Sequence, residues 1–220
     1  MTAPMAPGVQ RFNWDLQSQP IVTFPGMVLW GATQNGPVVL PGTYQARLTV
    51  DGRALPPQPF IVKKHPYHTA TDADLQAQFD LAMQIRDKVD EANNAIVQIR
   101  RLKQQLADRM TKTSNADAKA IAEEFAKELT TVEESVYQVR NQSNQDPLNF
   151  PIKTNNRIAS LLGMTLRGEG KPTANIYPIF EDLKKELKAE TDRLDEVLTA
   201  DMAAFNAEAK RAGVEPIGGK

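Results

Sequence analysis

The stretch TDADLQAQFDLAMQIRDKVDEANNAIVQIRRLKQQLADRM, residues 71–110, decides the fold of this chain. Its apolar side chains recur at steps of three and four residues, which is the spacing of one face of an α-helix. Thr71, followed by Asp72 and Asp74, supplies a candidate N-cap with carboxylates in the first turn, where the helix dipole favours negative charge. The stretch therefore predicts one amphipathic helix about 60 Å long, at about 1.5 Å per residue.

Three later segments repeat this spacing. They are residues 116–141, a short segment at 153–166 and a long last segment at 173–211. The second and third helices together are about as long as the first or the last, so we predict three antiparallel rods, the second one broken around Asp146–Pro151. A four-helix up-and-down bundle is the alternative. The heptad-like spacing also suits a coiled coil between chains, but the short linkers favour packing within the chain.

Residues 1–66 differ from the rest in composition. They hold ten of the 15 prolines but only seven charged residues, whereas residues 67–220 carry 46. Period-two alternation over 12–16 and 44–50, an apolar run at 27–30 and a return strand at 60–62 after Asp51-Gly52 predict about four strands. An immunoglobulin-like sandwich needs about seven. We therefore expect an α+β chain, with a truncated Ig-like antiparallel β-sandwich over residues 1–66 and a helical bundle over 67–220.

Composition excludes several function classes. The chain has no cysteine, so thiol nucleophiles, thiolate metal sites and disulfides are excluded. Its net charge of −1 provides no field that would attract nucleic acid. No apolar run reaches the roughly 18 residues that a membrane span needs, and the start MTAPMAPGVQRF lacks the basic and apolar regions of a signal peptide. We expect no nucleic-acid partner, no membrane span and no signal peptide in this chain.

Motifs for catalysis or cofactor binding are weak. Gly163 and Gly168 have the spacing of a phosphate loop, but Glu169 stands where its lysine belongs. His65 and His68 have no local carboxylate to complete a metal site, and no serine lies in a Gly-x-Ser-x-Gly elbow. The many glutamates of residues 123–134 are typical of a solvated helix face. We therefore predict no catalytic residue, no metal site and no cofactor.

The break in the second rod is the one segment with candidate ligand-binding residues. Amide and carboxylate groups beside an aromatic ring are what a sugar or an extended peptide would contact. The candidates are Asn141, Gln142, Asn144, Asp146, Asn149 and Phe150, together with Trp30 as a ring for sugar stacking. The alternative is that the loop groups cap two helix ends and that Trp30 belongs to the β core. We favour the capping role for the loop, and the sequence leaves Trp30 undecided.

Six separated segments, taken in order, carry a family resemblance. They are GVQRFNWDL (8–16), FPGMVLWG (24–31), PGTYQARLTVDG (41–52), QPFIVKK (58–64), DADLQAQFDL (72–81) and VRNQSNQDPLNFPI (139–152). This succession resembles the C-terminal part of bacterial sortilin-like propeller proteins, usually labelled glycosyl hydrolases with BNR or Asp-box repeats. In that family an Ig-like domain and a helical region follow the propeller blades. No Asp-box occurs here, so the resemblance implies that the propeller is absent and that its catalytic label transfers no residue to this chain.

The resemblance implies a function of the accessory kind. We expect a noncatalytic interaction module that docks or assembles through its β edge and its helices, either on the propeller of the parent protein or on a second copy as a homodimer. A glycan-binding or glycan-hydrolysing module is the alternative expectation. Members of the family are typically exported, which implies a periplasmic or extracellular setting.

Overall fold

Helix α1, Asp72–Met110, is the longest of the described helices, and the other three pack against it. The structure is a computed structural model that describes residues 8–218. The Thr71 hydroxyl accepts the N–H of Asp74, and the Asp74 carboxylate accepts the N–H of Thr71 in return, so the predicted N-cap is confirmed as a reciprocal capping box. Buried apolar residues run along the face that the sequence periodicity predicted, from Leu81 to Leu106.

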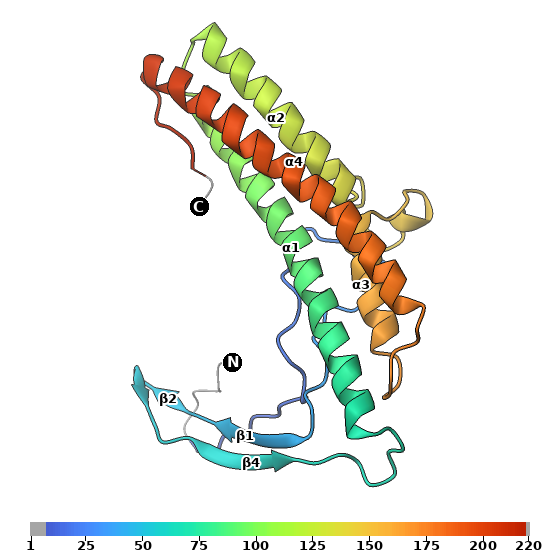
Figure 1. Cartoon of the computed structure of the whole chain (residues 1–220). Coiled ribbons are helices and arrows are strands. Elements are labelled where there is room, and N and C mark those ends of the chain that lie inside the picture. The colour runs from blue at the N-terminus through green and yellow to red at the C-terminus, as the bar shows by residue number, and fades with distance from the viewer. Residues whose placement is uncertain (1–7, 219–220) are drawn as a thin grey trace.

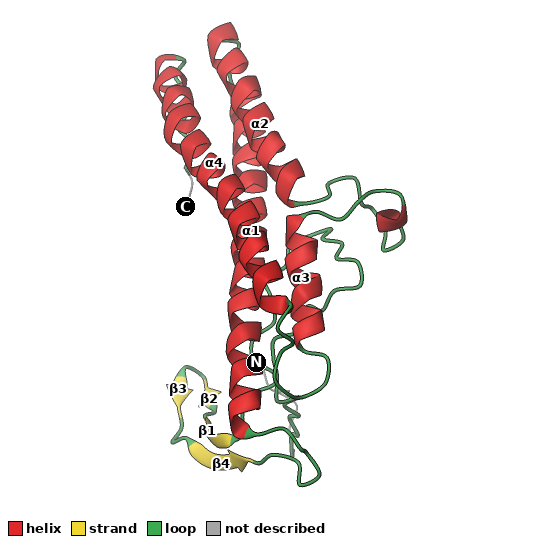
Figure 2. Ribbon diagram, turned by 45° about the vertical axis from the view of Figure 1, so that its right-hand side comes forward, coloured by secondary structure: helices red, strands yellow, loops and turns green. Residues whose placement is uncertain are grey.

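The remaining helices pack on α1 as two further rods. Helix α2, Ala116–Val136, and helix α3, Thr154–Thr165, both contact α1 and α4, Ile176–Arg211. Helix α3 continues in the direction of α2 toward the other end of α1, and α4 then runs back along both (Figures 1 and 2). The second rod is thus α2 plus α3, with a loop and the single turn η1, Asp146–Leu148, between them.

Two helix boundaries differ from the sequence prediction. Helix α2 ends at Val136 instead of residue 141, because Tyr137 takes an extended backbone conformation and points its buried ring toward the N-terminal segment. Helix α4 begins at Ile176 instead of residue 173. Pro178 lies in its first turn, where the missing N–H costs no helical hydrogen bond.

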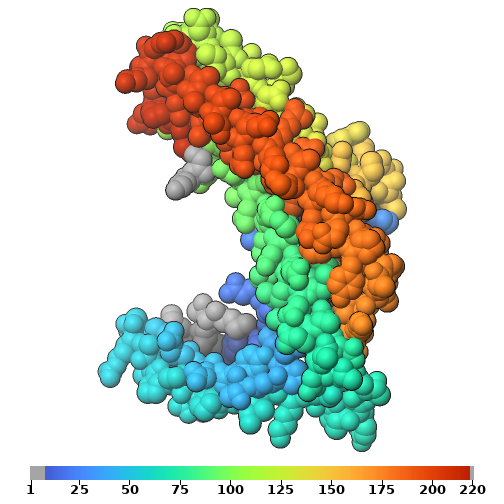
Figure 3. Space-filling model, in the orientation of Figure 1, coloured from blue at the N-terminus to red at the C-terminus, as the bar shows by residue number. Residues whose placement is uncertain are grey.

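A β arm projects from one end of the bundle (Figures 1 and 3). It is one long hairpin made of two ladders. Strand β1, Gly42–Ala46, pairs with β4, Gln58–Val62, and β2, Thr49–Val50, pairs with β3, Arg53–Ala54. Asp51 and Gly52 both have positive φ, 49° and 78°, as the two-residue turn predicted from the Asp-Gly pair requires.

The predicted strands at 12–16 and 27–30 are wrong. Both segments are irregular, and Gln17 forms only an isolated bridge with Val38. The Trp14 ring packs edge-on against Tyr44 and Phe60, so its alternation reflects ring packing on the arm and not backbone pairing. The described residues therefore contain two two-stranded ladders and no second sheet that faces them.

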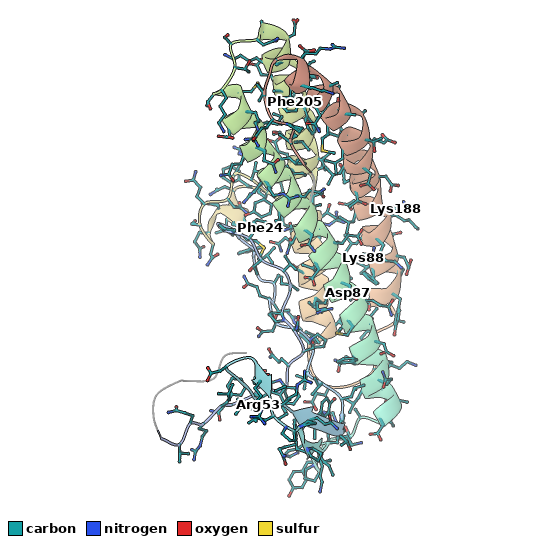
Figure 4. All side chains as sticks on the ribbon, turned by 90° about the vertical axis from the view of Figure 1, so that its left-hand side faces the viewer. Phe24, Arg53, Asp87, Lys88, Lys188 and Phe205 are labelled. Atoms are coloured by element: carbon teal, nitrogen blue, oxygen red, sulfur yellow. The ribbon has the colours of Figure 1, made fainter. Side chains whose placement is uncertain are left out.

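Residues 20–34, hereafter the strap, are packed on the helices. Ile21 and Phe24 belong to the same buried cluster as the apolar faces of α1 to α4. Figure 4 shows Phe24 against the middle of the bundle and Arg53 far from it on the arm. The hydrophobic core thus crosses the composition boundary near residue 66.

Candidate functional site

Asp146 and Gln138 make the main hydrogen bonds within the loop between α2 and α3. Asp146 accepts the backbone N–H groups of Gln142 at 2.5 Å and of Ser143 at 2.8 Å, and it also accepts the Ser143 hydroxyl. These bonds, first that from Gln142, hold the pKa of the Asp146 carboxyl below its ordinary value of 3.8. Gln138 donates to the carbonyl of Pro151 and so ties the two ends of the loop together. The carboxylate thus organises the loop backbone.

The other candidate residues of this loop do not converge on one site. Gln142, Asn144 and Asn149 are exposed. Asn141 is buried, and its side-chain oxygen has no hydrogen-bond partner among the described residues. Phe150 lies under the guanidinium of Arg140, with 4.0 Å between the Arg140 Cζ and the ring centre.

Trp30 is fixed by α3, and no hydrogen bond or ring contact within the described residues joins it to the 141–150 loop. Its backbone N–H donates to the Asn156 Oδ1 at 2.7 Å, and its carbonyl accepts from Asn156 Nδ2 at 3.1 Å. The Trp30 side chain is 45% exposed. The structure therefore holds the Trp30 backbone rigidly while leaving its ring accessible, and it does not assemble the predicted set of candidates.

Buried asparagines bond to the strap at two positions, Val22 and Trp30. Asn93 of α1 donates to the carbonyl of Val22 at 2.7 Å, and Asn155 of α3 donates to the Asn93 oxygen at 3.2 Å. The N–H of Val22 donates to Asp90. Asn93, Asn155 and Asn156 are almost completely buried. Side chains of α1 and α3 thus replace the sheet partners that the backbone of the strap lacks.

A charged cluster holds the middle of the strap. The buried Glu133 of α2 accepts from Arg100 at 2.7 Å and from Lys103 at 3.0 Å. Arg100 also donates to the carbonyl of Pro25 and lies over the Phe24 ring, which meets Tyr137 edge-on. The Tyr137 hydroxyl accepts the N–H of Val28 and donates to the carbonyl of Gly26. Arg100 and Tyr137 thus bond to the strap directly, and Glu133 holds Arg100 in position.

Sequence reasoning missed the side chains that hold the strap. They are Asn93, Arg100, Glu133, Tyr137, Asn155 and Asn156, hereafter the clamp residues. The signal that could have found them is a polar side chain at an apolar position of a helix. Asn93 lies between Val89 and Ile96 on the buried face of α1, and Glu133 adjoins Val132 on the buried face of α2. A buried polar residue needs a partner, and one partner of Asn93, the carbonyl of Val22, lies in the strap.

An open groove of about 670 Å³ separates the arm from the bundle. Residues 33–41, Val62–His65, the first turns of α1 and the turn after α3 line it. Its walls are mainly apolar, with Val39, Leu75 and Phe79 among them. Trp30 does not line this groove.

The two histidines lie close to other polar groups. The His68 Nε2 contacts the Glu169 carboxylate, and the His68 Nδ1 accepts the N–H of Ala70. His65 accepts the N–H of Tyr67. Among residues 8–218, no three histidine, aspartate or glutamate side chains gather as metal ligands would.

The arm exposes apolar side chains and unpaired strand edges. No strand contacts a helix within the described part of the chain. Strands β1 and β4 pair only with each other, so the outer edge of each is open. Ile61 is 65% exposed. Other apolar residues of the arm that stay exposed are Leu48, Val50, Leu55 and Phe60. Open edges beside exposed apolar residues are typical of surfaces that pair with another chain.

No helix in residues 8–218 has the length and apolar character needed to cross a membrane. No family model, curated protein or solved structure matches this chain.

Proposed function

We propose that this chain is a noncatalytic interaction module that docks on a partner through the β arm. The observation that carries the proposal is the exposure of Ile61, Leu48 and Val50 on a two-stranded ribbon with two open edges. A two-stranded ribbon alone is at best marginally stable in water, and further strands or a packed face stabilise it. The bundle, by contrast, has a continuous core of its own. The bundle thus acts as a rigid support that presents the arm.

The sequence resemblance supports the biological context of this proposal. We propose that the arm is the remaining part of an Ig-like sandwich, and that the chain corresponds to the exported C-terminal region of a sortilin-like, glycosyl hydrolase-labelled propeller protein. Its partner is then the propeller or a second copy. The glycan-binding alternative has weaker support, because within the described residues the accessible Trp30 ring makes no hydrogen bond or ring contact with the loop candidates, and the Asp146 carboxylate is bonded within the loop.

The test compares arm variants with a helix variant. The purified chain is titrated against a second copy and against a purified sortilin-like propeller, and binding is measured by light scattering and calorimetry. We expect Val50→Ser and Leu48→Ser to weaken the binding that is observed, because both remove exposed apolar area of the arm. Val97→Ser is the matched control, since Val97 is a similarly exposed apolar residue on α1. Binding that the arm variants leave at the wild-type level would overturn the proposed function.

A further inference from the structure

We propose that β1 is the docking edge of the arm and that a second copy of this chain pairs with it, β1 against β1, about a twofold axis. This inference rests on the proposed function, because it names the edge and the partner through which the module assembles. It is carried by the difference between the two outer edges of one hairpin.

The outer edge of β4 is protected against pairing. Pro59 lies within β4, opposite Gln45, and has no N–H to donate. Lys63 and Lys64 follow the strand directly. Between the two ladders the β4 side has three residues, 55–57, where the β1 side has two, so a bulge that contains Pro56 and Pro57 interrupts this edge. Proline, lysine and a bulge are the devices by which proteins block edge pairing.

The outer edge of β1 has none of these devices. Its sequence, Gly42-Thr-Tyr-Gln-Ala46, contains no proline and no charge. Because Pro59 cannot donate, its position in the ladder is one whose N–H points away from β1, and its partner Gln45 points outward in the same way. Thr43, two residues earlier, shares this orientation. Both residues are exposed, and no backbone hydrogen bond from them to another described segment exists.

A second copy fits this edge better than a charged partner strand does. The antiparallel register that pairs all five residues of β1 sets Thr43 opposite Gln45 of the other copy and Tyr44 opposite its own equivalent. Arg47 then faces Pro41, so no like charges meet, and Leu48, which is 51% exposed, faces Leu40. The product is a four-stranded sheet in the order β4, β1, β1, β4, whose outer edges are the protected ones. Four strands exceed the minimum that an independently stable sheet needs.

The arm is accessible for this pairing. It stands clear of the helices on the open side of the molecule, as the space-filling view shows (Figure 3). The Trp14 ring packs on Tyr44 and Phe60, which lie opposite each other in the ladder and share one face of the hairpin. In a twofold contact the outer edges of β1 in both copies are paired with each other, so no unprotected edge of the arm remains and the assembly stops at two copies.

The first experiment uses two proline variants of directly opposed residues, Thr43→Pro and Ile61→Pro. Each removes one outward N–H, the first from β1 and the second from β4. The dimer dissociation constant is measured by sedimentation over a dilution series. We expect Thr43→Pro to raise it on the order of 10- to 100-fold, because two symmetry-related hydrogen bonds are lost. Ile61→Pro should leave it within about threefold of wild type.

A charge pair keeps the proposal testable if proline disturbs the hairpin. The double variant Thr43→Lys with Gln45→Lys sets lysines opposite lysines across the twofold axis, and it should abolish the dimer. Thr43→Lys with Gln45→Glu sets opposite charges together, and it should retain the dimer. Helical circular dichroism of every variant confirms that the bundle is folded.

Three outcomes would overturn this inference. A wild-type chain that stays monomeric over the whole dilution series would exclude the second copy. Equal weakening by the two proline variants would exclude β1 as the specific edge, and equal behaviour of the two charge variants would exclude the register. The proposed function fails on a different result, namely affinity for either partner that stays at the wild-type level in Val50→Ser and Leu48→Ser.

Discussion

At the scale of single residues, the strap is held by side chains that each make two or more hydrogen bonds to its backbone or to one another. Asn156 accepts the backbone N–H of Trp30 and donates to its carbonyl, and the Tyr137 hydroxyl bonds to both Val28 and Gly26. An irregular buried backbone is stable only if such partners exist, because each unpaired buried group costs about 1–3 kcal/mol. The clamp residues therefore set how firmly the strap is bound.

Asn156→Ala is expected to lower the free energy of unfolding by about 2–3 kcal/mol, since it leaves the N–H and carbonyl of Trp30 without partners. Urea unfolding followed by circular dichroism measures the change. Asn94→Ala is the matched control, because Asn94 is an exposed residue of α1. It should change the free energy by less than about 0.5 kcal/mol. Equal effects of the two substitutions would contradict the role of Asn156.

Glu133→Gln is expected to destabilise the protein by about 1–3 kcal/mol, because Arg100 and Lys103 lose their shared carboxylate. The partial exposure of both cations limits the cost. Glu124→Gln, on the same helix, removes only a surface pair with Lys127 and should be nearly neutral. Thermal and urea unfolding of the two variants, side by side, provide the comparison.

At the scale of elements, the helices were predictable and the connections were not. Periodicity placed α1 and α3 within a residue or two at each end, since the apolar stripe and the Thr71 cap are local signals. The strap contains the apolar run at 27–30, yet its partners lie in α1 and α3, more than 60 residues away. No local pattern encodes such contacts, which is why a strand was predicted there.

The role of the candidate loop was predicted only in part. The bonds to Asp146 agree with the expected local satisfaction of the loop backbone. The expected capping differs from the structure, because no side chain in the described part of the chain makes a capping hydrogen bond at the start of α3. The grouping of Trp30 with this loop, by contrast, came from side-chain chemistry alone. Whether Trp30 lies near the loop depends on where the strap packs on the helices, and no local sequence pattern encodes that position.

The 142–146 turn is expected to open at low pH. The folded-state pKa of Asp146 is lowered, so its carboxylate stabilises the turn above the ordinary value of 3.8, and this contribution is lost as the pH falls through the lowered pKa. The amide resonances of Gln142 and Ser143 should therefore shift with a midpoint below 3.8. The same transition should be absent in Asp146→Asn. A midpoint at or above 3.8 in the wild-type chain would show that the bonds from these two amides are not formed in solution.

At the scale of the whole molecule, the strap couples the N-terminal region to the bundle while the arm remains outside the core. Phe24 is buried with the helices, whereas Phe12 is 51% exposed. The helices and the strap should consequently unfold as one unit, and the arm should exchange its amide hydrogens faster than either.

Phe24→Ala is expected to cost about 3 kcal/mol and to lower the midpoint of the helical melt, because its ring fills the space between Tyr137 and Arg100. The signal to follow is the circular dichroism at the helical minimum during heating. Phe12→Ala makes the same chemical change outside the core and should leave the midpoint in place. A helical melt that ignores Phe24→Ala would mean that the strap is not part of the helical core.

The strap also has a consequence for how the chain folds. Trp30 and Asn156 are 126 residues apart in sequence, so the clamp closes only after a large loop has been ordered. A helical bundle made of neighbouring helices folds quickly. In this protein the strap, near the start of the chain, must also pack against α3, which comes much later in the sequence. We expect the native Trp30 fluorescence to recover in a slower refolding phase than the helical signal in stopped-flow experiments. During synthesis, residues 20–34 leave the ribosome long before α3 exists, and until then their apolar side chains lack the helix surface that buries them in the folded protein.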